Sequence, residues 1–305
     1  VFLGFLLAYI ISSQQFGLSK VVGLGNKRDI DDVAVLNYLE QDPETKVICM
    51  YIEGVKDGRN FLTTAKRVSK KKPILVLKSG ITEKGAKVTM AHTGSLAGRS
   101  EIFDAACKQA GIIRVESFEQ LIDFAKAFAL QPVPKGNNLG VMSVTGAGCA
   151  IAADSAIKNG FQIPDLSSET VEVIRKISPP WHKQIGNPVD IGPPIEVGMH
   201  SPSDAEMFFN LAFKALLEDR NLDSVIILFF GLRRGFETVD RTFSSLASIT
   251  KRAVKPLFFS ITGDKQQTSE IAELLESHGF PVYPDITRAV KAMAAMREYY
   301  RLNRA

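Results

Sequence analysis

The sequence has few cysteines, no long uninterrupted apolar run and almost no excess charge. Its three cysteines, Cys49, Cys107 and Cys149, are odd in number and far apart. They form neither a disulfide framework nor a zinc-binding spacing, so we expect a reducing, cytoplasmic location. Lys and Arg number 37 against 33 Asp and Glu. A surplus this small gives no reason to expect a nucleic-acid partner.

The N-terminal segment Val1–Ile11 is almost wholly apolar. It is too short for a transmembrane helix, which needs about 20 such residues. It also lacks the basic region and cleavage site of a signal peptide. We expect a buried helix of a globular domain whose upstream part lies outside this sequence, and we disfavour the alternative of a membrane anchor.

Short apolar runs alternate with longer amphipathic stretches along the chain, which predicts βαβ units and parallel sheets. The expected strands, rich in Val, Ile and Leu, are Lys20–Leu24, Lys46–Ile52, Ile74–Lys78, Ile112–Val115, Leu139–Thr145, Ser224–Phe230 and Leu257–Ile261. The expected helices are Ile30–Glu40, Gly58–Ser69, Ser100–Gln109, Phe118–Leu130, Ala150–Asn159, Ser168–Ile177, Asp204–Asp219, Thr238–Lys251, Thr268–Ser277 and Ile286–Arg301.

A break in this alternation falls at Gln131–Asn138, a stretch with two prolines, a glycine and two asparagines. We therefore expect an α/β protein with two flavodoxin-like domains, residues 1–133 and 134–305, each with a mostly parallel, doubly wound sheet. Ligands of such sheets bind at the carboxyl ends of the strands. We also expect Pro179–Ser203, which is rich in proline and glycine, to be an irregular and functional loop.

The segment Ser79–Gly98 follows an expected strand and contains His92 beside Thr93, Gly94 and Ser95. Glycines allow close approach of the main chain to an anion, and amides and hydroxyls supply donors. An imidazole in such a setting can bind phosphate or become phosphorylated. A flexible loop with an incidental histidine fits the same pattern equally well.

Glu53 ends another expected strand, so its carboxylate should lie at the same edge of the sheet. A carboxylate bonded to one nitrogen of a histidine fixes the tautomer and makes the other nitrogen more nucleophilic. Glu53 and His92 are thus a candidate pair, although an exposed acid at a strand end is the commoner situation.

Two further segments offer polar groups. Residues 145–148 (Thr145, Gly146, Ala147 and Gly148) join a strand to a helix, and free amides at a helix start attract phosphate. The segment matches neither a Rossmann nor a P-loop motif, and a tight turn without a ligand is the alternative. In GNPVDIG, Asn187 and Asp190 suggest a pocket lining or a turn that hydrogen-bonds to itself.

In order and spacing, these segments resemble the NDP-forming acyl-CoA synthetase superfamily, which includes ADP-forming acetate–CoA ligase and succinyl-CoA synthetase. The most specific elements are AHTGSLAG and YIEGVKDG, and VVGLGNK, TGAGCAIAADSAIKNGF, GNPVDIG and HGFPVYPDITRAVKAM support them. The resemblance covers nearly the whole chain. It implies a ligase-CoA domain over the first half and a succinyl-CoA synthetase-like domain over the second.

The resemblance further implies a reversible phosphoryl relay from acyl-CoA and phosphate, through a phosphohistidine on a swinging loop, to ADP. His92 would carry the phosphoryl group, Glu53 would orient it, and Thr93, Gly94, Ser95 and residues 145–148 would bind phosphate. Gly25, Asn26, Asn187 and Asp190 would lie near the acyl and CoA end. CoA and ADP or ATP would be substrates, with none bound by this chain alone.

A CoA-binding domain and an ATP-grasp domain or subunit, which would hold Mg²⁺, are expected partners in a homo- or hetero-oligomer, with no membrane involved. Without them the 305 residues should not complete the reaction. Two alternatives remain: the ligase-like region of a protein lysine acetyltransferase and a non-catalytic assembly module. The other histidines, His182, His200 and His278, show no metal-binding spacing, and we expect none to be catalytic.

Overall fold

The computed structural model describes residues 8–12, 16–93, 100–198, 202–231 and 255–304. The chain forms two compact units. One comprises Val1–Ala129 together with Glu298–Ala305, and the other comprises Leu130–Arg297. Each has a parallel sheet with helices, so the expected α/β class is confirmed.

The sheet of the first unit has the order β1-β2-β3, with β1 at Ile48–Ile52, β2 at Ile74–Lys78 and β3 at Ile113–Val115. Both pairings are parallel. Every residue of β2 is buried, as the unbroken apolar run ILVL requires of a central strand. The expected strand at Lys20–Leu24 is wrong: this segment pairs with none of the described strands, and its Val21 and Val22 are half exposed.

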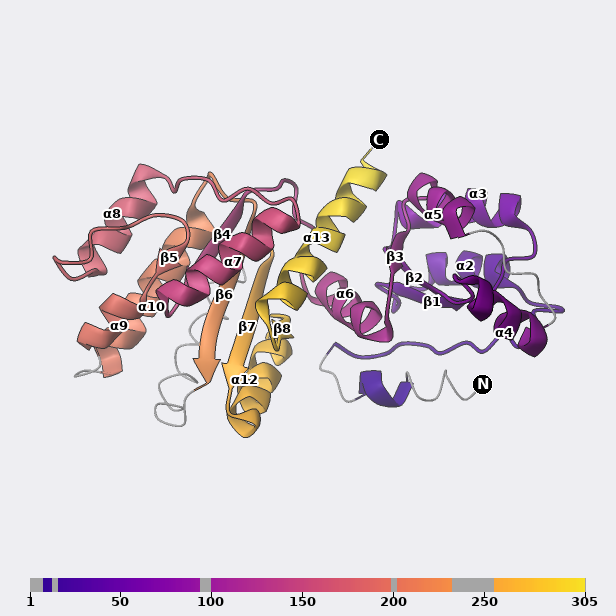
Figure 1. The fold of residues 1–305 in the computed structure, drawn as a ribbon, viewed down its shortest axis with the longest axis horizontal. Helices are drawn as coiled ribbons and strands as arrows, with labels where there is room; N and C mark the ends of the chain where they lie inside the picture. Colours follow the sequence, from indigo (N-terminus) through magenta and orange to yellow (C-terminus); the bar gives the residue numbers. More distant parts are fainter. Residues whose placement is uncertain (1–7, 13–15, 94–99, 199–201, 232–254, 305) are drawn as a thin grey trace. The chain divides into compact units, whose positions relative to one another are not determined.

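Helices cover both faces of this sheet (Figure 1). Helices α2 (Asp32–Gln41), α3 (Gly58–Ser69) and α5 (Ser100–Gln109) contribute to one hydrophobic core with β1 and β2. Helix α6 (Phe118–Leu130) packs on the opposite face, where Phe118 stacks on Tyr51 of β1 with ring centroids 6.0 Å apart. A further helix, α4 (Glu83–Thr93), follows β2.

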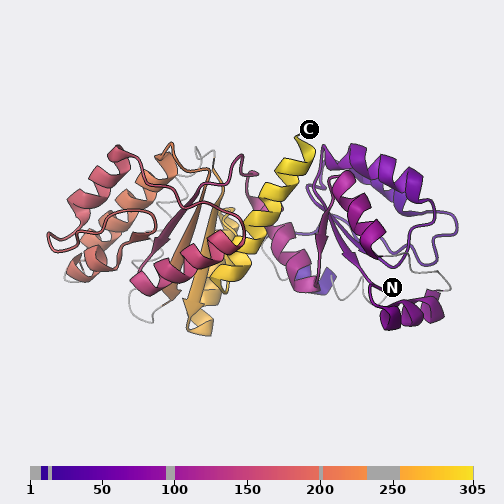
Figure 2. The same cartoon turned by 45° about the horizontal axis from the view of Figure 1, so that its top comes forward.

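The sheet of the second unit is also parallel throughout, in the order β5-β4-β6-β7-β8. These strands span Val189–Asp190 (β5), Leu139–Ser143 (β4), Ser224–Gly231 (β6), Leu257–Gly263 (β7) and Val282–Tyr283 (β8). Figures 1 and 2 show α7 (Gly146–Lys158) and α13 (Ile286–Asn303) together on one face. On the other face, the main core includes side chains of α8 (Ser168–Ile177), α10 (Pro202–Glu218) and α12 (Lys265–Ser277).

Several expected elements differ from the observed ones. The segment expected to be irregular contains β5 and helix α9 (Gly192–Gly198). Helix α7 begins at Gly146, four residues before the expected start, because the Thr145 hydroxyl accepts a hydrogen bond from the Gly148 amide and caps it. The expected helix Thr238–Lys251 lies outside the described residues.

The apolar N-terminus also departs from expectation. Residues 8–12 are helical, but the Tyr9 side chain is 78% exposed, so the described part of this segment is not the buried helix we expected. Within the described ranges, no helix is both long and apolar enough to cross a membrane.

The last residues of α13 belong to the first unit. The Tyr299 hydroxyl donates to the Ser69 carbonyl oxygen at 2.6 Å, and the Asn303 amide donates to the Gly111 carbonyl oxygen at 3.0 Å. The Tyr299 ring packs edge-on against Phe128, and burial raises the pKa of its hydroxyl to about 12. The end of the chain therefore completes the packing of α3, β3 and α6.

Asn187 fastens the start of β4 in the second unit. Its side-chain oxygen accepts from the Val141 amide at 3.0 Å. Its side-chain nitrogen donates to the carbonyl oxygens of Leu139 at 2.8 Å and Pro164 at 3.1 Å. One side chain thus satisfies three main-chain groups in segments far from its own turn, and a role of Asn187 in lining a pocket stays a prediction.

We expect Asn187→Ala to lower the free energy of unfolding by about 2 kcal/mol, because partly buried main-chain groups of β4 would lose their partners. Urea unfolding followed by circular dichroism measures this change. The exposed Asn60→Ala is the control and should stay within about 0.5 kcal/mol of the wild type. Equal stability of the two variants would contradict the structural role of Asn187.

Candidate functional site

The first part of the candidate site is the carboxyl edge of β1 and β2. Parallel pairing places Ile52 beside Lys78, so the two strands end side by side. The Ser79 amide donates to the Ile52 carbonyl oxygen at 3.1 Å and extends the pairing by one bond. Glu53 therefore leaves β1 next to the start of the segment that leads to His92.

The Glu53 carboxylate is partly buried and weakly held. Its only described hydrogen bond is a long one, 3.4 Å from the Tyr51 hydroxyl. The main chain of the residue is held better, because the Lys78 ammonium donates to the Glu53 carbonyl oxygen at 2.8 Å. The position of the carboxylate therefore depends mainly on the main chain that carries it.

Lys78 is a polar residue that the sequence analysis missed. It is 5% exposed, and its ammonium also donates to the Ser79 carbonyl oxygen. The Phe103 ring lies with its centroid 5.9 Å from the ammonium. Burial lowers the pKa of Lys78, and the nearby charges of Arg114 and Lys27 lower it further, while the Glu53 carboxylate opposes them.

A second lysine holds the next residue of the same turn. Lys27 donates to both carboxylate oxygens of Asp32, at 2.8 and 2.7 Å, and to the Gly54 carbonyl oxygen at 2.9 Å. Lys27 is the last residue of a turn in which its amide donates to the Leu24 carbonyl oxygen, Gly25 has a φ of 53° and Lys27 itself has a φ of 55°. The exposed Gly25 and Asn26 are thereby brought to the same edge as Glu53, and their place near the acyl and CoA groups stays a prediction.

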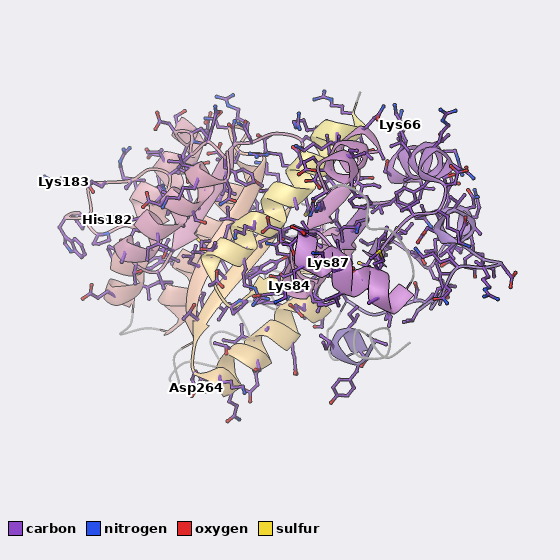
Figure 3. All side chains as sticks on the ribbon, turned by 45° about the vertical axis from the view of Figure 1, so that its right-hand side comes forward. Lys66, Lys84, Lys87, His182, Lys183 and Asp264 are labelled. Atoms are coloured by element: carbon purple, nitrogen blue, oxygen red, sulfur yellow. The ribbon has the colours of Figure 1, made fainter. Side chains whose placement is uncertain are left out.

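His92 does not lie in a glycine-rich loop, and that prediction is wrong. It lies in the last turn of α4, which Figure 3 shows with Lys84 and Lys87 on it. The Thr82 hydroxyl caps the helix by accepting from the Gly85 amide at 3.1 Å, and Lys87 pairs with Glu83. Thr93 shares this last turn, and Gly94 and Ser95 lie outside the described residues. The contact between Glu53 and His92 stays a prediction.

In the second unit, α7 starts at the carboxyl end of β4. Thr145, Gly146 and Ala147 are exposed there, and the first amides of a helix have no intrahelical acceptor. The Gly148 amide is taken by the Thr145 hydroxyl at 3.0 Å. This leaves the amides of Gly146 and Ala147 as the donors that a phosphate could reach.

Asp190 lies beside the same helix start. One of its carboxylate oxygens would be 3.2 Å from a β-carbon placed on Gly146, and the other accepts from the Gly192 amide at 2.9 Å. Burial raises the pKa of the Cys149 thiol to about 12, and the Asp190 charge adds to this. Cys149 is therefore protonated and unreactive at neutral pH.

The remaining histidines lie elsewhere. His182 and Lys183, labelled in Figure 3, follow α8, where the His182 ring neighbours Trp181. His278 ends α12 and its Nδ1 lies 2.8 Å from the Leu274 carbonyl oxygen. His200 lies outside the described residues. No group of three potential metal-binding side chains occurs in the described part of the chain.

Two family models match the chain. One, described as "Succinyl-CoA ligase like flavodoxin domain", matches residues 3–128. The other, described as "Ligase-CoA domain", matches residues 141–305. The two names fall on the halves of the chain in the order opposite to that expected from the resemblance.

Curated relatives match nearly the whole chain. An ADP-forming acetate–CoA ligase II of Archaeoglobus fulgidus is 38% identical over 98% of this chain and 43% of the relative. The α subunit of an ADP-forming acetate–CoA ligase I of Pyrococcus furiosus is 35% identical over 94% of this chain and 59% of the subunit. The chain thus spans about half the length of these relatives.

A solved structure gives the same result at the level of the fold. It is a dinucleotide forming acetyl-coenzyme A synthetase 1 of Candidatus Korarchaeum cryptofilum in complex with phosphate and ADP, with 31% identity and a TM-score of 0.88. The match covers 99% of this chain and 63% of that chain. From its two matched domains and these relatives, we conclude that the chain belongs to the Ligase-CoA domain family, within the NDP-forming acyl-CoA synthetase superfamily.

Proposed function

We propose that this chain is the part of an ADP-forming acyl-CoA synthetase that carries a phosphoryl group on His92. The complete enzyme would convert acyl-CoA, ADP and phosphate to the free acid, ATP and CoA, reversibly. The main support is that relatives named ADP-forming acetate–CoA ligases match the chain along almost its whole length. Neither the acetyltransferase alternative nor the assembly module finds support in the comparisons.

The proposed reaction has three steps: one transfer of the acyl group and two transfers of the phosphoryl group. Phosphate attacks the thioester carbonyl, so that CoA leaves and an acyl phosphate forms. An imidazole nitrogen of His92 then attacks phosphorus, the bond to the acyl oxygen breaks, and the carboxylate leaves. In the last step, a terminal oxygen of ADP attacks the phosphohistidine, which returns the histidine and gives ATP.

In this scheme Glu53 orients the imidazole by accepting a hydrogen bond from its second nitrogen. Support for this role comes from the position of Glu53 at the carboxyl edge of β1, beside the end of β2 from which the chain continues to α4. The same edge carries Gly25 and Asn26, which we propose to lie near the acyl and CoA groups.

For phosphate binding at the start of α7, we propose the amides of Gly146 and Ala147. A helix start contributes roughly 0.3–1 kcal/mol to holding an anion, and more when it is partly buried. The nearby Asp190 carboxylate repels the same anion. Net attraction at this helix start is therefore weak, which suits a phosphoryl group that must be released.

The proposed partners are a CoA-binding domain and a nucleotide-binding domain or subunit of the ATP-grasp type. Relatives that are longer than this chain support additional parts. CoA and ADP or ATP would be substrates of the complete enzyme. Mg²⁺ would be bound with the nucleotide, and the described residues of this chain include no cluster suited to a metal ion.

We expect His92→Ala to abolish the incorporation of acid-labile phosphate when the complete enzyme is incubated with labelled acetyl phosphate. The change removes the only nucleophile proposed for this step. Peptide mapping of the label provides the measurement. His278→Ala, at the exposed end of α12, is the matched control and should incorporate label like the wild type. Label on the His92→Ala protein would exclude this residue as the carrier.

We expect Glu53→Gln to slow phosphorylation on the order of 10- to 100-fold, because the amide holds the imidazole less well. Rapid-quench kinetics with labelled acetyl phosphate measure the rate, and the free energy of unfolding should change by less than about 0.5 kcal/mol. The exposed Glu44→Gln is the control. An unchanged phosphorylation rate would argue against the pairing of Glu53 with His92.

A further inference from the structure

The carbonyl oxygens at the ends of β1 and β2 converge on one buried ammonium group. Lys78 donates to the carbonyl oxygen of Glu53, just after β1, and to that of Ser79, just after β2. These two residues begin the segments that lead to the two members of the proposed catalytic pair. Lys78 therefore links the main chain of Glu53 directly to the main chain that continues to His92.

We propose that Lys78 is a positioning residue for the reaction, whose ammonium fixes the main chain from which the Glu53 carboxylate projects. This inference rests on the proposed function, because it assigns Lys78 a part in the pairing of Glu53 with His92. The first support is the Glu53 side chain itself. Its 3.4 Å contact with the Tyr51 hydroxyl is longer than an ordinary O–H···O bond, so it places the carboxylate poorly.

The second support is the energetic cost of the arrangement. A lysine that is 5% exposed has its ammonium largely removed from water, whereas a methionine of similar size would fill the space without that cost. Among the described residues, no carboxylate forms an ion pair with Lys78. Two carbonyl oxygens and the face of Phe103 offset only part of the loss. A charged residue at such a place is a candidate for a role beyond packing.

The third support is that the charge of Lys78 acts on Glu53. The carboxylate is the acid whose charge most favours the protonated form of this lysine. The neighbouring Lys27 is paired with the two oxygens of Asp32, whereas Lys78 forms no ion pair among the described residues. Lys78 thus holds the main chain of Glu53 and attracts its carboxylate at the same time.

The chain contains a matched control for this arrangement. Lys72, just before β2, also bridges two main-chain carbonyl oxygens, at 2.6 Å from Leu39 and close to Asp42. It lies at the opposite end of the same strand from Lys78. Removal of its charge should therefore disturb local packing in a similar way without affecting Glu53.

The experiment is a double-mutant cycle on the complete enzyme, with labelled acetyl phosphate as the probe and single-turnover phosphorylation of His92 as the signal. Lys78→Met should slow phosphorylation on the order of 10- to 100-fold, with little change in the half-saturating acetyl phosphate concentration. In the Glu53→Gln background the same change should have an effect of less than about threefold, because no carboxylate remains to be placed. Lys72→Met should leave the phosphorylation rate unchanged in each background, relative to the parent of that background.

The proposal would be overturned if Lys78→Met slowed phosphorylation by the same factor in the wild-type and Glu53→Gln backgrounds. It would also be overturned if Lys72→Met slowed phosphorylation as much as Lys78→Met does. Absence of acid-labile phosphate on the unmodified enzyme would instead refute the proposed function itself, so the two failures are distinguishable. If Lys78→Met does not fold, the cycle is run with Lys78→Gln, whose uncharged amide nitrogen can still donate to a carbonyl oxygen. The same comparisons of phosphorylation rate then support or overturn the proposal.

Discussion

Parallel pairing of β1 with β2 is the constraint on which the candidate site depends. Two neighbouring strands that run in one direction must release their chains at the same edge, and the register that sets Ile52 beside Lys78 makes the two exits adjacent. Residues that are 25 apart in sequence, Glu53 and Lys78, thereby share a hydrogen bond. Every residue of β2 is buried, so a shift by one residue would put each side chain into packing that fits its neighbour, and this opposes slipping of the register.

The main-chain carbonyl groups that follow the strands at that edge need hydrogen-bond donors, and lysine side chains supply them. Lys27 serves Gly54 and Lys78 serves Glu53, so the turn after β1 is held by two ammonium groups. Of the two lysines, Lys27 forms an ion pair with Asp32, and Lys78 forms none with any described residue. In the second unit, side-chain amides and hydroxyls hold the main chain in the same way. Asn187 hydrogen-bonds to the main chain of β4, and Thr145 caps α7. Polar residues near the candidate site are therefore divided between holding the main chain and remaining available to a ligand.

The long apolar strands and the well-capped helices could be predicted from the sequence, because burial and capping leave local patterns. The helices Gly58–Ser69, Ser100–Gln109, Phe118–Leu130 and Ser168–Ile177 have the bounds expected for them. Helix α4 was missed because Gly80 and Gly85 indicated a loop, whereas Gly85 fits the capped first turn against Thr82. The strand expected at Lys20–Leu24 failed because an apolar run becomes a strand only where a partner pairs with it. Lys78 was overlooked because a lysine after an apolar run usually marks the solvent end of a strand.

Helix α13 has a consequence for how the chain can be divided. Its last turns belong with the first unit, where Tyr299 and Asn303 bond to main-chain oxygens of Ser69 and Gly111. A fragment cut at Ala129 would keep every strand of the first sheet and yet expose Phe128 and leave those oxygens without their donors. The shortest self-sufficient form of this unit is therefore discontinuous in sequence, and dissecting it would call for circular permutation that joins residues 298–305 to its start.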